Sequence, residues 1–574
     1  MKKLAASRFG WIGVLLLLVL LNVAGSLAVV RADLTAEKRF TLSEPVKHML
    51  SGIDGQVTIT VFLSGNLPKD FRKLKNSTAA LLESLREVNP GALRYSFAQP
   101  GEALPDSVKP AFLDSLARLG IKPYTINAVI KEGQGEEQRQ VVPGALVSYH
   151  GKAVGVDLLA GQNSELDEAS INRVEATLEY KFAHAIHQLT IDTVPLIGYL
   201  AGNGEPLSYN VYDLIERIIK PNYAFRIFQL DSFPVIPPIF KAILVAKPTE
   251  KFSDEQKLKL DQYVMHGGRV LWMVDQLYAE MDSLRRVQND FIAFDRGLNL
   301  EDIFFKYGVR VNQDLVQDLN CAKIATTTGG EAGGKPQVAS LSWTYFPLLS
   351  GGNHPIVKNL DYVVAQFPNS IDTVAAAGIK KTILLSTSPE SRVLSTPAKV
   401  SWNSIQTEED LRKFNGGPVP VAVLLEGPFR SLYNNRLGTL QRDQLIAAGE
   451  PFLAEAASPG KMIVVADGDI ALNLVTQKEG PIHMGIPETY PAYRYTYANS
   501  EFMMNAIEYL VDNSGILETR SKDITLRLLD KKKLERDKTQ WQIINIAGPL
   551  LLVILLGSLY QFIRRRKYRG SAEI

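Results

Sequence analysis

Polar and acidic side chains follow several predicted strands of this sequence, at the point where each strand ends. The strands are predicted at residues 194–200, 270–274 and 461–466, where runs of apolar residues are bounded by turn residues. In open α/β sheets the carboxyl ends of the strands form the crevice in which ligands bind. The candidate crevice residues are Asn203, Glu205, Asp275, Asp467 and Asp469.

These residues also have a simpler interpretation, because Asn, Asp and Gly are the ordinary residues of turns. If the crevice binds a ligand, its carboxylates favour a sugar hydroxyl, an amine or a basic side chain of a partner protein. The residue types alone leave both interpretations open.

A nucleotide-binding loop is a weaker candidate. Residues 329–335 match the pattern G-x-x-x-x-G-K, but Pro336 stands where a P-loop has Ser or Thr. Proline supplies neither the hydroxyl that binds Mg²⁺ nor a backbone N–H for phosphate. The sequence therefore predicts no nucleotide or other cofactor.

Candidate catalytic and metal-binding residues are equally weak. Cys321 is the single cysteine, and no strand–helix elbow surrounds it as a nucleophile requires. His184 and His187 lie three residues apart on a predicted helix and could approach a metal together with Glu179, although an ordinary helix surface or domain contact explains them as well. We therefore expect no catalytic and no metal-binding residue, and a protein that is not an enzyme.

Composition sets the broad class. The chain has 574 residues, enough for about three domains at roughly 100–200 residues each. Its hydrophobic fraction of 46% and charged fraction of 22% are typical of folded globular chains, and the net charge of +2 gives no sign of nucleic-acid binding. With one cysteine, no intramolecular disulfide can form.

Two uncharged apolar segments, 11–30 and 543–563, are each long enough as a helix to cross the roughly 30 Å of a bilayer core. Basic residues precede the first segment in the tail 1–10 and follow the second in the tail 564–574, which predicts two spans with both termini in the cytoplasm. A cleaved signal peptide is the alternative for the first segment. We expect a bacterial inner-membrane protein with a periplasmic body.

The body is predicted to be α/β. Residues 31–190 alternate as β-α-β-α-β-β-(β)-α, which predicts a thioredoxin-like domain, although no Cys-x-x-Cys is present. Residues 191–515 alternate strands and helices, which predicts a Rossmann-like parallel sheet with insertions, including a Thr-, Gly- and Pro-rich loop at 326–338. A juxtamembrane helix is expected at 516–542.

A set of short motifs in a shared order resembles one family. The motifs are the segment 31–43 after the first apolar stretch, Leu67-Pro68 with Phe71 and Leu74, Gly204-Glu205, YVMHGGRV at 263–270, Tyr307-Gly308-Val309, DLVQD at 314–318, Tyr345-Phe346-Pro347, His354-Pro355, Asp467-Gly468-Asp469, LRLLD at 526–530, Trp541-Gln542 and the basic end. Together they resemble the GldG family, which are auxiliary or substrate-binding proteins of ABC transporters associated with gliding motility.

The resemblance implies a permease and a cytoplasmic ATPase as partners, and a middle domain shared with intraflagellar-transport proteins and related to class I glutamine amidotransferases. It favours a non-catalytic subunit that binds a periplasmic ligand or an envelope protein. Two alternatives remain, namely a scaffold of a motility or secretion machine, and an envelope enzyme that acts on glycan or peptide.

Overall fold

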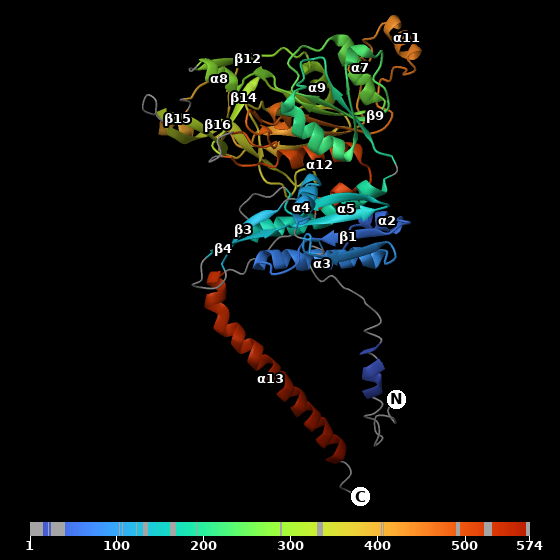
Figure 1. The fold of residues 1–574 in the computed structure, drawn as a ribbon, viewed down its shortest axis with the longest axis vertical. Coiled ribbons are helices and arrows are strands. Elements are labelled where there is room, and N and C mark those ends of the chain that lie inside the picture. Colours follow the sequence, from blue (N-terminus) through green and yellow to red (C-terminus); the bar gives the residue numbers. More distant parts are fainter. Residues whose placement is uncertain are drawn as a thin grey trace. The chain divides into compact units, whose positions relative to one another are not determined.

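The computed structural model forms two compact units, Met1–Asp523 and Ile524–Ile574 (Figure 1). Each unit is described by itself below. The described residues are 15–20, 22–23, 41–102, 104–105, 107–121, 123–129, 136–160, 168–191, 193–287, 290–329, 337–402, 405, 407–488, 494–521 and 531–569.

The first sheet of the body has four strands in the order β2-β1-β5-β6. Strand β1 pairs in parallel with β2 and antiparallel with β5, which in turn pairs antiparallel with β6. Residues alternate between buried and less buried along β1, as a pleated strand requires. The strands are β1 (Val57–Val61), β2 (Leu93–Phe97), β5 (Gly144–Tyr149) and β6 (Lys152–Asp157), and β3 (Tyr124–Val129) and β4 (Glu136–Val141) form a separate antiparallel pair.

Four helices accompany this sheet. Helix α3 turns a stripe of apolar residues inward, with Phe71, Leu74, Leu82 and Leu85 buried at helical spacing. Helix α5 packs against α3 and against β5 and β6. The helices are α2 (Glu44–Ser51), α3 (Lys69–Val88), α4 (Lys109–Arg118) and α5 (Glu168–Thr190).

The second sheet has ten strands. Its order is β15-β16-β19-β22-β23-β10-β9-β7-β8, with β17 paired to β16. The five strands from β23 to β8 run parallel, and β22, β19, β16 and β15 continue the sheet antiparallel. The strands are β7 (Leu196–Leu200), β8 (Ala224–Phe228), β9 (Phe240–Ala246), β10 (Arg269–Met273), β15 (Cys321–Gly329), β16 (Gln337–Gly351), β17 (Val363–Val364), β19 (Lys380–Ser386), β22 (Pro420–Gly427) and β23 (Gly460–Val465).

Both faces of the central strands are buried, which explains their nearly continuous apolar sequence. Along β9, Leu244 belongs to one hydrophobic core, whereas its neighbours Ile243 and Val245 belong to the core on the opposite face. The first core also includes the apolar residues of the four-stranded sheet. The two sheets of the body therefore share one continuous hydrophobic core.

Helices cover the second sheet and connect its strands. Helix α7 (Asp254–Met265) joins β9 to β10 and begins at a capping box formed by Ser253 and Gln256. Helix α12 (Asn499–Val511) packs against β9, β10 and β23. The apolar periodicity of residues 212–219 favours a helix, and Asp213–Ile219 form a π-helix, η2.

Short elements complete the body. The strands are β11 (Leu277–Tyr278), β12 (Phe291–Asp295), β13 (Val309–Val311), β14 (Asp314–Asp318), β18 (Ile371–Thr373), β20 (Ser391–Ser395), β21 (Ala398–Val400), β24 (Val475–Thr476) and β25 (Gly480–Pro481). The helices are α6 (Lys220–Asn222), α8 (Met281–Val287), α9 (Glu301–Tyr307), α10 (Glu408–Arg412) and α11 (Thr439–Ala447), with short helices η1 (Tyr209–Val211), η3 (Leu230–Ser232), η4 (Asp469–Ala471) and η6 (Ile516–Ser521).

The mixed α/β class predicted from the sequence is confirmed, and one local prediction is wrong. The segment 326–338 was expected to be a loop, but its two ends belong to the antiparallel strands β15 and β16. Residues 330–336, which join them, lie outside the described residues. The domain boundaries at 190 and 515 stay predictions.

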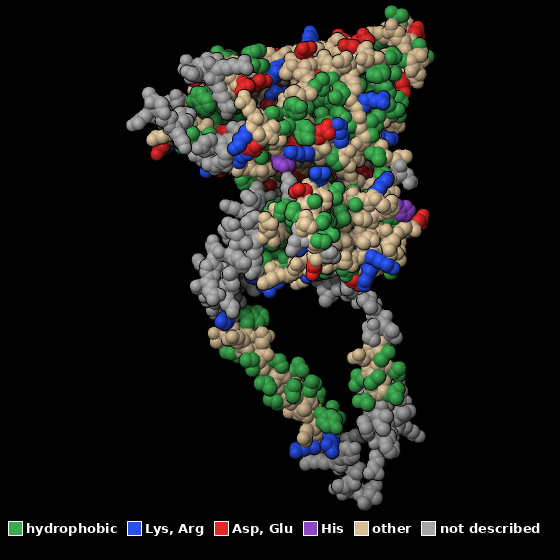
Figure 2. Space-filling view, viewed as in Figure 1, with side chains coloured by type: hydrophobic (Ala, Val, Ile, Leu, Met, Phe, Trp, Pro, Cys, Tyr) green, Lys and Arg blue, Asp and Glu red, His purple; other side chains and the backbone are tan. Residues whose placement is uncertain are grey.

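The C-terminal unit contains one long helix, α13 (Lys531–Arg569). Its part Arg536–Arg566 is long and apolar enough to cross a membrane, by length and composition, and covers the predicted span 543–563. Figure 2 shows its exposed hydrophobic side chains, followed by basic side chains. Of the predicted helix 516–542, residues 516–521 form the 3-10 helix η6, residues 531–542 belong to α13, and 522–530 lie outside the described residues.

The first predicted span, 11–30, is described only in part. Residues 15–20 and 22–23 are helical and exposed, and the remaining residues of this segment lie outside the described ones.

Candidate functional site

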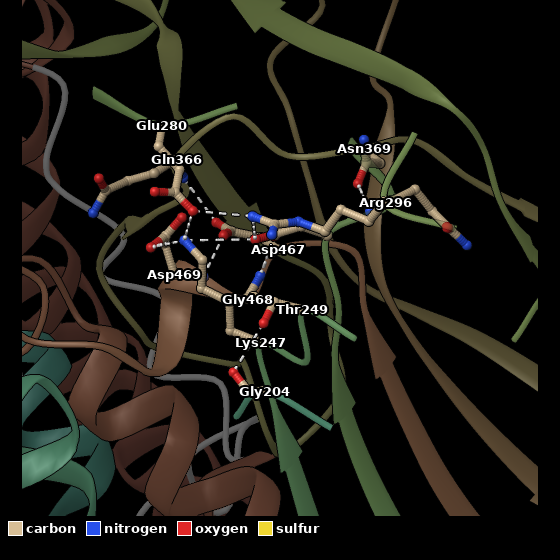
Figure 3. A network of polar contacts seen from close by, with 12 residues as sticks. Gly204, Lys247, Thr249, Glu280, Arg296, Gln366, Asn369, Asp467, Gly468 and Asp469 are labelled. Atoms are coloured by element: carbon tan, nitrogen blue, oxygen red, sulfur yellow. Dashed lines mark hydrogen bonds and ion pairs between the residues drawn. The ribbon is translucent and has the colours of Figure 1, made fainter. Parts of the chain in front are cut away.

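Three carboxylates meet at the carboxyl edge of the parallel strands. Asp275 follows β10, and Asp467 and Asp469 follow the neighbouring strand β23. One carboxylate oxygen from each lies within 4.8 Å of those of the other two. The pairing of β10 with β23 is parallel, so both strands end at the same edge. The structure thus brings the three side chains together, and Figure 3 shows Asp467 and Asp469 beside Lys247.

Lys247 supplies a cation to this cluster. It follows β9, the other neighbour of β10, and its Nζ lies 2.6 Å from Asp469 Oδ1, 3.6 Å from Asp275 Oδ2 and 3.8 Å from Glu280 Oε1. Its φ of +45° is unusual for a residue with a side chain. Lys247 thus adopts a strained backbone at the position where its ammonium reaches the carboxylates.

Arg296 and Glu280 reach the cluster from the chain segment that carries β11, α8 and β12. Arg296 is buried, and its guanidinium lies 3.1 Å from Glu280 Oε1 and 3.7 Å from Asp275 Oδ2. The crevice expected from the sequence was acidic alone. The structure corrects this, because Lys247 and Arg296 offset part of the negative charge.

The carboxylates are also held by backbone N–H groups. Asp467 accepts hydrogen bonds from the N–H groups of Asp469 and Gln366, both at 2.8 Å, and Asp275 Oδ1 accepts one from Gly468 N at 2.6 Å. Burial, reinforced by the charges of Asp469 and Asp275, raises the pKa of Asp467 well above its ordinary value. Asp467 therefore contributes less negative charge near neutral pH than the other two.

The same cluster shifts the pKa values of its other members. Burial raises the pKa of Asp469 to about 6, against the opposing charge of Lys247. Burial would lower the pKa of Lys247, but the charges of Asp469 and Asp275 outweigh it and raise that pKa. Lys247 accordingly stays protonated across the physiological range.

Gly468 allows Lys247 to approach the loop after β23. A Cβ on Gly468 would lie 2.6 Å from Lys247 Cβ and 2.9 Å from its Cα. Glycine at this position is thus required by close packing.

A cavity of about 420 Å³ opens beside the cluster. Three carboxylate residues line it, namely Glu280, Asp282 and Asp469, together with the cation Lys247. The rest of the lining is Gly204, Pro206, Asn210, Thr249, Met281, Val364, Gln366, Phe367, Leu472, Asn473, Leu474, Val475, Gly485, Ile486, Pro487 and Asn499. This volume is in the range of small-molecule sites, roughly 300–1,000 Å³.

The other two predicted crevice residues, Asn203 and Glu205, are not among the residues that line the cavity. Asn203 donates to Lys251 O and Gln256 Oε1, and Glu205 Oε2 accepts from the N–H of Asn203. Burial raises the pKa of Glu205 to about 7. From this loop, Gly204 and Pro206 line the cavity.

The remaining candidates of the sequence have structural partners. His184 pairs with Glu508 at 3.0 Å, His187 lies 3.8 Å from Asp512, and Glu179 accepts hydrogen bonds from Ser43. These contacts explain the three residues without a metal ion.

Cys321 is poorly suited to act as a nucleophile. Burial, together with the charge of Asp318, raises the pKa of its thiol to about 12, so the thiolate is scarce. Most of the G-x-x-x-x-G-K segment, residues 330–335, lies outside the described residues.

The arrangement is suited to binding. The oxygens of Asp275, Asp467 and Asp469 could bind a metal ion, but the Lys247 ammonium already contacts Asp469. The groups best placed to meet a ligand are carboxylates beside an ammonium.

The chain resembles known proteins along most of its length. It is 19% identical to an uncharacterized protein of Borreliella burgdorferi, over 96% of each chain. Its first part, residues 36–148, matches a family model described as a domain of unknown function.

Solved structures resemble it weakly. The N-terminal domain of mmIFT52 aligns with 58% of this chain and 100% of its own, at 15% identity and a TM-score of 0.28. The exo-beta-1,4-mannosidase Op5Man5 of Opitutaceae bacterium strain TAV5 aligns with 84% of this chain and 54% of its own, at 10% identity and a TM-score of 0.19.

A second family model, described as an ABC-type uncharacterized transport system, matches residues 195–506. This range includes the second sheet, Lys247, Arg296 and the three aspartates. Since the match covers more than half of the 574 residues, the chain belongs to this family of ABC transport auxiliary proteins.

Proposed function

We propose that this protein is a non-catalytic auxiliary subunit of an ABC transporter, anchored in the bacterial inner membrane, with a periplasmic body that binds a ligand or partner in the cavity beside Lys247. The observation that carries the proposal is the family match over residues 195–506, because the whole cavity lining lies within that range. The binding site is thus built from the region that the family shares.

The membrane part of the proposal rests on α13 and on the charge-free segment 11–30. Basic residues next to both segments favour cytoplasmic termini, which leaves the body outside. In this proposal the energy of transport comes from a separate cytoplasmic ATPase, and the two spans pack beside a permease.

Finer assignments belong to the same proposal. The four-stranded sheet with its helices would be thioredoxin-like, and the parallel half of the second sheet Rossmann-like. The motif resemblance to the GldG family supports a link to gliding motility.

The test is purification of the tagged full chain from its own bacterium in a mild detergent. We expect a permease and an ATPase to copurify in a fixed ratio, and mass spectrometry identifies both. A variant in which an unrelated apolar helix replaces residues 531–569 serves as the control for membrane proteins that copurify without specific binding. Recovery of the tagged chain without either transporter subunit would refute the proposal.

A further inference from the structure

Carboxylates exceed cations at the cavity. Asp467 is not counted, because burial raises its pKa. Among the described residues of the cluster and the cavity lining, the carboxylates of Asp275, Glu280, Asp282 and Asp469 are then accompanied by two cations, Lys247 and Arg296. Three of these four carboxylate residues line the cavity itself. The cavity therefore keeps net negative charge after its internal ion pairs are formed.

Several carboxylate oxygens lack a donor. Within the described part of the chain, Glu280 Oε2 and Asp469 Oδ2 accept no hydrogen bond, since the contacts of these residues involve Glu280 Oε1 and Asp469 Oδ1. Asp275 Oδ2 also accepts no hydrogen bond, but it is buried between Lys247 and Arg296 at 3.6 and 3.7 Å and is not part of the cavity lining. The acceptors open to a ligand N–H group are therefore the second oxygens of Glu280 and Asp469, both of which line the cavity.

Lys247 shows which chemistry the cluster accepts. Its ammonium donates to Asp469 at 2.6 Å and lies within 4 Å of two further carboxylates. An ammonium carries three N–H donors and no acceptor, which suits a wall of carboxylate oxygens. The apolar part of the lining, including Leu474 and Val475, can contact the hydrocarbon body of such a ligand.

We propose that the cavity binds a primary ammonium group, either of a free organic amine or of a lysine side chain of a partner polypeptide. The ligand ammonium lies on the cavity side of Lys247 and donates to the second oxygens of Glu280 and Asp469, and Asp282 adds negative charge to the lining. The inference rests on the proposed function only in that it assigns the ligand to the same cavity.

Direct titration of the purified full chain in detergent tests the inference. The probes are n-pentylamine hydrochloride, an acetylated and amidated tripeptide with a central lysine, tetramethylammonium chloride and calcium chloride. We expect saturable binding of the amine, of the peptide or of both, and no competition by tetramethylammonium, which carries the charge but no N–H donor. Tighter binding of the peptide assigns the ammonium to a partner, and tighter binding of the free amine assigns it to a small ligand.

Variants locate the site. Because each removes one charged hydrogen-bond acceptor, Asp469→Asn and Glu280→Gln should each weaken amine binding by about 10-fold or more. Glu280 is 32% exposed in its side chain, so its variant keeps the test informative if Asp469→Asn fails to fold. Asp443→Asn, on the exposed surface of α11, is the matched control and should bind as the wild type does.

Three results would overturn the inference: a folded wild type that binds neither ammonium probe, tetramethylammonium that competes equally, or calcium that displaces the amine from the site. Transporter subunits take no part in the titration. A failed titration therefore does not contradict the copurification result, and failed copurification does not contradict binding of an amine.

Discussion

Lys247 neutralises part of the charge at the carboxyl edge of the second sheet. It is 9% exposed, and its ammonium contacts carboxylates that come from β10, from β23 and from the segment after β11. Removing one partner of a buried ion pair leaves an uncompensated charge, which costs more than the pair itself contributes. The side chain is thus important for stability as well as for binding.

We expect Lys247→Met to lower the free energy of unfolding by about 3 kcal/mol, because Asp275 and Asp469 lose their shared counterion in a buried site. Urea denaturation followed by tryptophan fluorescence measures the change. Lys413→Met is the control, since Lys413 forms an exposed pair with Asp410 that is worth about 0.5 kcal/mol. Equal effects of the two variants would contradict the assigned role of Lys247.

Gly468→Ala tests the close packing directly. We expect a loss of about 1–3 kcal/mol in the free energy of unfolding, because the added methyl group displaces Lys247. Gly91→Ala is the matched control, since the nearest atom to its added Cβ is a side-chain oxygen 3.8 Å away, and it should stay within about 0.5 kcal/mol of wild type. Calorimetric melting of both variants decides the comparison.

Part of the site follows from sequence order alone. Asp275, Asp467 and Asp469 were predicted because each follows a strand, and the parallel pairing of β10 with β23 brings them together. Lys247 follows β9 in the same way, so the same rule could have found it. Arg296 reaches the cluster only through the insertion after β10, and no local pattern in the sequence indicates that path.

Helices α5 and α12 meet through a buried ion pair. His184 on α5 lies 3.0 Å from Glu508 on α12, whose second oxygen accepts a hydrogen bond from the Tyr180 hydroxyl, and Arg520 lies over the Tyr180 ring. Burial would lower the pKa of His184, but the charge and hydrogen bond of Glu508 raise it above 6.5. Against the effect of burial, the same pair lowers the pKa of Glu508 below 4.5.

The stability that this pair contributes depends on pH. The His184 part is full below 6.5 and is lost as pH rises through its higher folded pKa, and the Glu508 part is full above 4.5 and is lost as pH falls through its lower folded pKa. We therefore expect the difference in Tm between wild type and His184→Gln to be largest between pH 4.5 and 6.5 and to shrink by pH 9. Melting curves across pH measure this, and His48→Gln, at an exposed position, should show no such profile.

Helices with apolar stripes and strands with nearly continuous apolar runs were predictable, as α3 and β9 show. The antiparallel pair β15–β16 could not be predicted in the same way, because threonine and glycine are common in loops as well as in strands. The two segments form strands because they pair with each other. The π-helix η2 was also missed, since the apolar periodicity of 213–219 fits an α-helix equally well.

The proposed arrangement with two membrane anchors predicts that either anchor alone holds the chain in the membrane. A chain that ends at residue 530 should stay in the membrane pellet after alkaline carbonate extraction, because the segment 11–30 is long enough to hold it. A chain that also carries a cleavable signal peptide in place of residues 1–30 should be released. Release of the first variant would mean that the segment 11–30 is removed from the mature protein.

The length of α13 has a mechanical consequence. Its 39 residues extend for about 58 Å, nearly twice the roughly 30 Å of a bilayer core. In the proposed membrane arrangement, the polar turns from Lys531 onward would project beyond the hydrocarbon as a continuation of the same helix. A tilt imposed on α13 inside the bilayer would then displace Lys531 as well, so the helix would act as a lever arm between the lipid and the aqueous space.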